Sequence, residues 1–126
     1  MSSLGDLMMT DLVTVAPEDS IGEAAQKMVD RDTGSAIVSD FGRLIGILTE
    51  RDLLRAVAAR THSSETRVRE WMTADPVTAT PDTLPADAAQ VMIDQGFRHL
   101  PVVDGERAIG IVSIRDVMRW SLEQAE

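Results

Sequence analysis

The pattern of hydrophobic and polar positions predicts short strands that alternate with amphipathic helices. A β-branched run, Val13–Val15, is stopped by Pro17 and indicates a strand. Ser20 and Glu23 have the spacing of a capping box. The helix that follows carries an apolar stripe of Ile21, Ala24, Ala25, Met28 and Val29. Strands at 36–39 and 44–48 flank a tight turn and predict a β-hairpin, and a second helix begins at Thr49 or Glu50.

The same order of elements returns after a polar segment, residues 59–69, which we predict to be a linker with a short helical turn near its end. A strand at 77–79 is followed by a helix that starts near Thr83 and Pro85, includes Ile93 in its apolar stripe and ends at Gly96. Strands at 100–103 and 108–112 form a second hairpin before a last helix. The predicted fold class is therefore α+β, a mixed α/β chain in which the order β-α-β-β-α occurs twice.

The chain also repeats itself in sequence. With an offset of 64 positions it matches itself without gaps, so that Leu12–Pro17 falls on Pro76–Pro81 and Gly46–Asp52 falls on Gly110–Asp116. We expect a first repeat at 1–58, the linker at 59–69 and a second repeat at 70–126, related by pseudo-two-fold symmetry. Each repeat alone is of marginal size for a stable core, so the two are expected to pack together, with paired clefts between them that suit symmetric ligand binding.

Composition narrows the classes of function. The 126 residues carry a net charge of −9, which disfavours binding to nucleic acid or to an anionic membrane because phosphate contacts dominate such affinity. The chain has no cysteine, which excludes disulfides and thiolate sites and fits the cytoplasm. No apolar stretch approaches the ~20 residues of a membrane span, and the first residues lack the pattern of a signal peptide. We therefore expect a cytoplasmic protein.

Catalytic and metal-binding patterns are absent from the sequence. His62 lies in the linker and His99 precedes a predicted strand, and neither shares a motif with a serine nucleophile or with further metal ligands. Phosphate-binding loops of the Gly-x-Gly-x-x-Gly or Walker type do not occur. The sequence predicts a protein that is not an enzyme, holds no metal and requires no cofactor.

Three sequence elements occur together and carry a family resemblance. The first is Met9–Pro17, seen again at Met72–Pro81, and the second is Gly96–Asp104. The third places a Thr or Ser three residues before an Asp at the end of each hairpin, in Gly46–Asp52 and Gly110–Asp116. In this combination the chain resembles a tandem pair of CBS domains, named after cystathionine β-synthase and also called a Bateman module. The resemblance covers about residues 6–121.

The resemblance implies a stand-alone regulatory sensor rather than a catalyst. Such pairs bind an adenosine-containing effector, of the AMP, ADP, ATP or S-adenosylmethionine class, in the clefts between their two repeats, and signal to a separate effector protein. Members of the family usually form homodimers through helical faces. Candidate residues for that face are Met28, Met92, Met118, Leu53, Leu54 and Val117. The same residues could instead fill the core of the monomer.

The family motifs also imply roles for particular residues. The carboxylates of Asp52 and Asp116 are expected to accept hydrogen bonds from the two ribose hydroxyls, because charge-assisted bonds are stronger than neutral ones. Contacts to phosphate or ribose are expected from Thr49, Ser113, Arg98, His99, Arg51 and Arg115. The adenine-facing strands are expected to be Val13, Thr14, Val15 and Val77, Thr78, Ala79.

Simpler structural alternatives exist for these residues. A Thr or Ser three positions before an Asp also fits a helix capping box, in which the two side chains only begin a helix. Gly34-Ser35 stand in the first repeat where the second has Arg98-His99, so the two sites differ if basic residues hold phosphate. Arg51 and Arg115 could simply pair with neighbouring carboxylates. The competing hypothesis for the whole chain is a ligand-free dimerisation or interaction module that kept the architecture.

Overall fold

Hydroxyl side chains determine where the main helices of the central segment begin. The computed structural model describes residues 2–125, and Val13–Pro76 forms one compact unit, here called the β1–β4 unit. Its elements are β1 (Thr14–Val15), α2 (Ile21–Asp30), β2 (Ser35–Asp40), β3 (Arg43–Thr49), α3 (Glu50–Ala58), α4 (Val68–Trp71) and β4 (Thr73–Ala74). Ser20 caps α2 by accepting a hydrogen bond from the Glu23 N–H at 3.1 Å, and Thr49 caps α3. The predicted capping box before α2 is confirmed.

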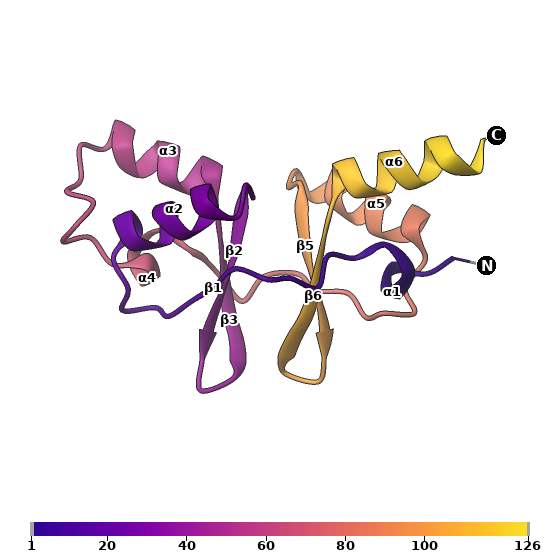
Figure 1. Ribbon diagram of the computed structural model, residues 1–126, viewed down its shortest axis with the longest axis horizontal. Coiled ribbons are helices and arrows are strands. Elements are labelled where there is room, and N and C mark those ends of the chain that lie inside the picture. The colour runs from indigo at the N-terminus through magenta and orange to yellow at the C-terminus, as the bar shows by residue number, and fades with distance from the viewer. Residues whose placement is uncertain (1, 126) are drawn as a thin grey trace. The chain divides into compact units, whose positions relative to one another are not determined.

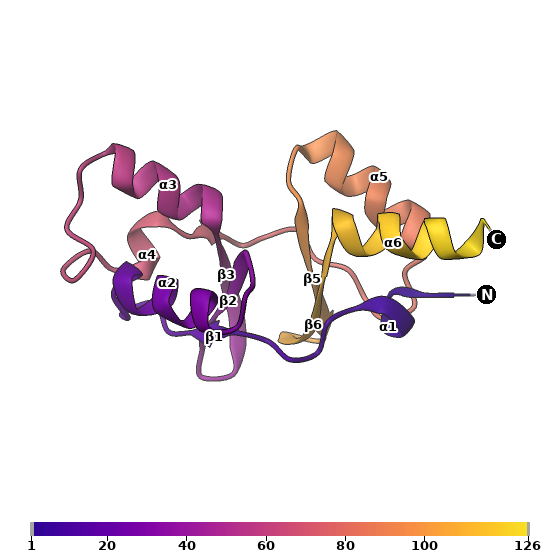
Figure 2. The same cartoon turned by 45° about the horizontal axis from the view of Figure 1, so that its top comes forward.

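The strands of the β1–β4 unit form a single sheet in the order β1-β2-β3-β4. β1 runs parallel to β2, and the remaining pairs are antiparallel. Helices α2 and α3 lie on the same side of this sheet (Figures 1 and 2). Because β3 runs opposite to β1 and β2, the end of β3, where α3 begins, lies at the same edge of the sheet as the starts of β1 and β2.

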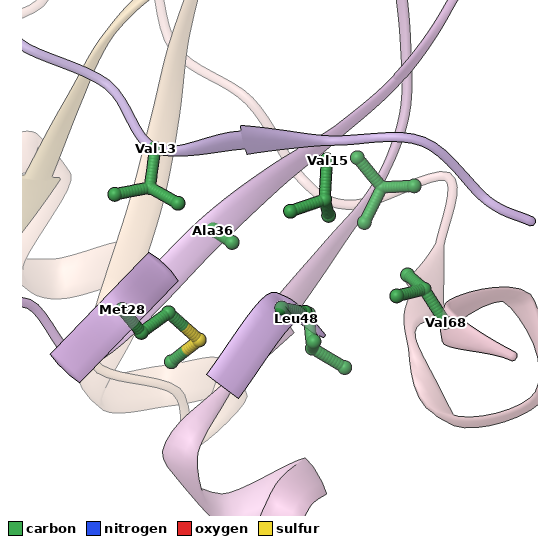
Figure 3. Close-up of a cluster of buried hydrophobic side chains, with 8 residues drawn as sticks. Val13, Val15, Met28, Ala36, Leu48 and Val68 are labelled. Carbon is green, nitrogen blue, oxygen red and sulfur yellow. The ribbon is translucent and has the colours of Figure 1, made fainter. Parts of the chain in front are cut away.

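Aliphatic side chains from every layer of the β1–β4 unit meet in one core. Val13 and Val15 extend from the β1 segment towards Met28 of α2 and Leu48 of β3 (Figure 3). Val68 of α4 joins them and is fully buried. The two valines are thus fixed by burial, which holds β1 against β2 although the strand is only two residues long.

The second compact unit joins the N-terminal segment up to Leu12 with the chain from Val77 onward and is called the β5–β6 unit. Its elements are α1 (Leu4–Leu7), α5 (Pro85–Gln95), β5 (His99–Asp104), β6 (Arg107–Ser113) and α6 (Ile114–Gln124). β5 and β6 form an antiparallel hairpin, and α5 and α6 lie on the same side of it (Figures 1 and 2). Its core consists of Leu4, Ala88, Met92, Leu100, Val102, Val112 and Val117. The predicted mixed α/β fold with two repeats is confirmed.

Each unit is completed by the segment that precedes the other repeat in the sequence. Leu4 and Gly5 donate backbone hydrogen bonds to the carbonyls of Thr83 and Pro81, at 2.9 and 2.8 Å. In the other unit, α4 makes the equivalent bonds, from Val68 to Asp19 at 2.8 Å and from Arg69 to Pro17 at 3.0 Å. The helical turn expected near the end of residues 59–69 is therefore part of the core of the β1–β4 unit rather than only a connection.

One predicted strand is wrong. Val77–Ala79 was expected to repeat β1, but only Ala79 makes a bridge there, to Val102. In β1, the N–H of Ile37 donates to the Val13 carbonyl at 2.8 Å. The residue 64 positions after Ile37 is Pro101, which has no N–H to donate to Val77. The missing donor shortens the parallel pairing in the second repeat.

The apolar stripes predicted for α2 and α5 include one residue too many at their C-terminal ends. Val29 and Ile93, the last apolar residues of the stripes, are 73% and 68% exposed, whereas Met28 and Met92 are buried. A residue eight positions along a helix is rotated by roughly 80° from the first, which moves it to the flank of the buried face. Both helices therefore carry an apolar residue in solvent at the same position of the repeat.

Candidate functional site

The start of α3 holds the first of two matching polar motifs, Thr49–Asp52, here called the first motif. The Thr49 hydroxyl accepts a hydrogen bond from the Asp52 N–H at 3.4 Å, and the Asp52 carboxylate accepts from the Thr49 N–H at 2.9 Å and from its hydroxyl at 3.1 Å. The arrangement is a capping box, so the structural alternative for these residues is realised. A cap leaves the carboxylate beside the N–H groups of the first turn of the helix, where a further ligand can also reach them.

The carboxylate of the first motif is buried and paired. Asp52 is only 2% exposed, and its Oδ1 accepts a hydrogen bond from Nη2 of Arg55 at 2.5 Å. Its Oδ2 is the atom bound to Thr49. Both oxygens of Asp52 therefore have partners within its own helix turn.

The start of α6 holds the second motif, Ser113–Asp116, in a looser form. Asp116 accepts from the Ser113 N–H at 2.9 Å, and the Ser113 hydroxyl accepts from the Asp116 N–H at 3.1 Å. Arg119 is the counterpart of Arg55, but its Nη1 lies 3.9 Å from Oδ1 of Asp116, beyond hydrogen-bond distance. The Asp116 side chain is 17% exposed. Oδ1 of Asp116 is thus more accessible to an added hydrogen-bond donor than Oδ1 of Asp52.

The residues next to each motif differ in charge. In the β5–β6 unit, His99 pairs with Ser113 across the hairpin, and the carbonyl of Arg98 accepts from the Ile114 N–H at 2.9 Å. Arg98 is exposed and His99 is half-buried. The structure therefore brings together Ser113, Asp116, Arg98 and His99 within one unit.

The same place in the β1–β4 unit is occupied by an acid. The Gly34 carbonyl accepts from the Glu50 N–H at 3.0 Å. A β-carbon on Gly34 would lie 3.1 Å from Oε1 and 3.3 Å from Oε2 of Glu50, so the Glu50 carboxylate fills the space where a side chain at this position would begin. Beside the first motif, the Glu50 carboxylate therefore occupies the place where the Arg98 side chain begins beside the second motif.

The strand residues expected to face adenine differ in the burial of their side chains. Val13 and Val15 are buried in the core, while the side chain of Thr14 is exposed. The Val13 carbonyl bonds to β2, so the alternation of the backbone turns the N–H and C=O of Thr14 away from β2. In the β5–β6 unit, Ala79 uses its N–H and C=O on Pro101 and Val103, which leaves Thr78 in the equivalent position, beside exposed Val77.

Arg51 and Arg115, inside the two motifs, are both exposed. Across residues 2–125, no three His, Cys, Asp or Glu side chains converge as a metal ion would need. Within the same range, no helix combines the length and the apolar character that crossing a membrane requires.

Sequence reasoning missed Glu50, Arg55 and Arg119. Each arginine lies three residues after the aspartate of its motif, a spacing that brings side chains together on one helix face and was visible in the sequence. The closure of Asp52 by its arginine, and the wider separation at Asp116, required the structure. The approach of Glu50 to Gly34 depends on the pairing of β2 with β3 and was not visible in the sequence.

Comparison with known proteins identifies the family. The sequence profile of the CBS domain matches twice, at residues 4–59 and 68–123. The chain belongs to the CBS domain family. The CBS domain-containing protein YhcV of Bacillus subtilis is 37% identical over 117 residues, which cover 93% of this chain and 84% of that protein. The predicted family resemblance is therefore confirmed.

Two solved CBS-pair structures contain adenosine compounds. CBSX2, crystallised with AMP, has a TM-score of 0.84 and 28% identity, with 100% of both chains covered. The CBS domain pair of protein MJ0100, crystallised with 5′-methylthioadenosine and S-adenosyl-L-methionine, has a TM-score of 0.91 and 27% identity, with 98% of both chains covered. Related CBS pairs therefore bind adenosine ligands with and without phosphate.

Proposed function

We propose that this CBS pair is a non-catalytic regulatory module that binds an adenosine-containing effector at the first and second motifs. The observation that carries the proposal is the duplicated capping motif, which places an aspartate beside a helix N-terminus once in each unit. Related pairs of the same fold were crystallised with AMP and with S-adenosyl-L-methionine. These ligands share adenine and ribose, so the shared part is what we assign to the motifs.

The chemistry of the motif suits a ribose. A carboxylate accepts charge-assisted hydrogen bonds from two vicinal hydroxyls, which are stronger than neutral ones. Oδ1 of Asp116 accepts no hydrogen bond from Arg119, which is 3.9 Å away, so a ribose hydroxyl would not have to replace that partner. At the other end of the ligand, the outward N–H and C=O of Thr78 offer a donor and an acceptor for the edge of the adenine ring.

Phosphate is best placed at the second motif. His99 pairs with Ser113 across the hairpin, and the Arg98 carbonyl accepts from the N–H of the next residue, Ile114. The N-terminus of α6, eleven residues long, adds oriented N–H groups and the positive end of the helix dipole. A nucleotide phosphate there would be met by positive charge from a side chain and from the backbone.

Thermal unfolding with a panel of AMP, ADP, ATP, S-adenosylmethionine and adenosine tests this function. A ligand at about a hundred times its Kd stabilises the folded state by about 2.7 kcal/mol. We expect stabilisation by at least one compound, reduced by Asp116→Asn, which keeps an acceptor for the cap but removes the charge. Glu23→Gln makes the same change in the capping box of α2 and should leave the stabilisation intact. If no compound stabilises the folded protein, the ligand-free interaction module becomes the better account.

We also propose that the chain forms a homodimer through helix faces. Apolar side chains are exposed on the helices of both units: Val29, Leu54 and Val57 on α2 and α3, and Ile93, Met118 and Leu122 on α5 and α6. Two pairs, Val29 with Ile93 and Leu54 with Met118, are 64 positions apart, so the exposure repeats with the sequence. Of the residues expected on this face, Met28, Met92 and Val117 are instead buried in the cores, and Leu53 is half-buried.

Sedimentation of the wild type and of a Leu54→Glu/Met118→Glu variant tests the dimer. Both side chains are exposed, at 70% and 60%, so the variant should fold with a melting temperature close to that of the wild type. We expect a dimer for the wild type and a monomer for the variant. A wild-type monomer at high concentration would contradict this part of the proposal. Signalling would then follow if a partner protein binds the liganded and unliganded states with different affinity.

A further inference from the structure

We propose that the two motifs select ligands of different charge, and that Glu50 excludes phosphate from the first motif. The inference rests on the proposed function, since it concerns the ligand bound there. Under it, the second motif takes a phosphorylated adenosine compound. The first motif takes an adenosine compound whose 5′ substituent is uncharged or positively charged, such as a thioether or a sulfonium.

The position of the Glu50 carboxylate carries the first step. Its two oxygens stand over Gly34, 3.1 and 3.3 Å from where a β-carbon would lie. Gly34 is the counterpart of Arg98, which adjoins the second motif. Negative charge thus stands in the first unit at the place where the side chain of an arginine begins in the second unit. A phosphate brought to this place would meet a like charge, which disfavours binding.

The Glu50 carboxylate also weakens the attraction of the α3 N-terminus for a ligand phosphate. Glu50 is the first residue of α3, where the N–H groups and the helix dipole attract anions. A carboxylate at this position already satisfies that field and competes with a ligand phosphate. The counterpart at the start of α6 is Ile114, which carries no charge, so Asp116 is the one acid in the first turn of that helix, whereas α3 has both Glu50 and Asp52.

The charges around the two motifs agree with this difference. Residues 34–35 and 49–55 contain two acids and two arginines: Glu50, Asp52, Arg51 and Arg55. Residues 98–99 and 113–119 contain one acid and three arginines: Asp116, Arg98, Arg115 and Arg119. The surroundings of the first motif are therefore neutral in sum, and those of the second are positive before any contribution from His99.

The difference does not remove the ribose site from the first motif. Asp52 accepts a hydrogen bond from the N–H of its capping residue, as Asp116 does in the second motif. The N–H and C=O of Thr14 point away from the neighbouring strand, as those of Thr78 do. What changes is the group tolerated at the 5′ end of the ligand. We assign the first motif to ligands that lack phosphate for this reason.

Isothermal titration with AMP and with 5′-methylthioadenosine tests the inference. For the wild type we expect one AMP per chain, lost in Asp116→Asn. 5′-Methylthioadenosine should still bind to Asp116→Asn and lose that binding when Asp52→Asn is added. Glu50→Ile, which introduces the residue of the second repeat, should strengthen AMP binding at the first motif by about tenfold or more and raise the stoichiometry towards two.

Matched variants separate the inference from the proposed function. Glu65→Gln removes an exposed acid of the same unit that lies outside the motif, and it should leave the AMP stoichiometry at one. Two equal AMP sites in the wild type, or an AMP affinity unchanged by Glu50→Ile, would overturn the charge selection and leave the adenosine module standing. Failure of both compounds to bind the folded wild type would overturn the proposed function and the inference with it.

Discussion

Arg55 donates a hydrogen bond to one oxygen of the Asp52 carboxylate, with its Nη2 2.5 Å from Oδ1. The arginine forms this contact although 61% of its side chain is exposed. The same pair in the second repeat, Arg119 and Asp116, is separated by 3.9 Å. Under the proposed function, a ribose bound by Asp52 would displace or share the Arg55 contact, whereas Asp116 would accept it without displacing Arg119. Under the proposed function, we expect this pair to give the two motifs different ligand affinities.

Removing the Arg55 contact should open the first motif. We expect Arg55→Gln to strengthen binding of 5′-methylthioadenosine at Asp52 several-fold and to lower the free energy of unfolding by about 1–3 kcal/mol, because a buried carboxylate loses a charged partner. Arg119→Gln, the matched change at the looser pair, should alter both quantities much less. Calorimetric titration and urea unfolding measure the two effects. Weaker binding by Arg55→Gln would show instead that Arg55 holds the ligand.

Two serines with the same cap geometry separate capping from binding. Ser20 and Ser113 each accept a hydrogen bond from an N–H three residues later at 3.1 Å. Replacing either by alanine should destabilise the protein by about 0.5–2 kcal/mol. Only Ser113→Ala should also weaken AMP binding, as measured by titration. Equal AMP affinity in the two variants would show that Ser113 acts only as a helix cap.

Gly46 and Gly110 allow two methionines to approach the sheets. A β-carbon on either glycine would clash with the side chain of Met72 or Met8 respectively. We expect Gly46→Ala to destabilise the protein by about 1–3 kcal/mol through overpacking. Adding Met72→Ala should recover part of that loss, so the double variant is more stable than the sum of the single effects predicts. Strictly additive unfolding free energies would contradict the packing described.

Restoring the missing donor at position 101 should lengthen the parallel pairing of the second repeat. Pro101→Ile introduces the residue found at the equivalent position 37 and supplies an N–H towards the Val77 carbonyl. Hydrogen exchange followed by NMR should show a protected amide at position 101. An amide there that exchanges as fast as those of the exposed loops would mean that another cause shortens the strand.

The local sequence was sufficient to predict most elements, because their signals lie within a few residues. Ser20 and Thr49 each act through a hydrogen bond to a residue three positions on, and both helix starts were read correctly. Val77–Ala79 was misassigned because its partner Pro101 is distant in sequence. The effect of Pro101 could have been found by comparing the two repeats position by position.

The candidate site was only partly visible in the sequence for a different reason. The repeated Thr or Ser with Asp identified the motifs. Whether each aspartate contacts the arginine three residues later depends on distances that a sequence does not specify. Asp52 and Asp116 have the same spacing to their arginines, yet one pair is in contact and the other is not. The charge placed over Gly34 likewise depends on strand pairing and on the direction of the Glu50 side chain.

The most direct test of the central claim is an NMR titration of the ¹⁵N-labelled protein with AMP. If the second motif binds the nucleotide, the amide signals of Ser113, Asp116 and Thr78 should shift with a single saturable dependence on AMP concentration. The amides of Ser20 and Glu23, in a capping box outside the motifs, should stay in place. Saturation without any shift at Ser113 and Asp116, or no shift anywhere in the folded chain, would contradict the account.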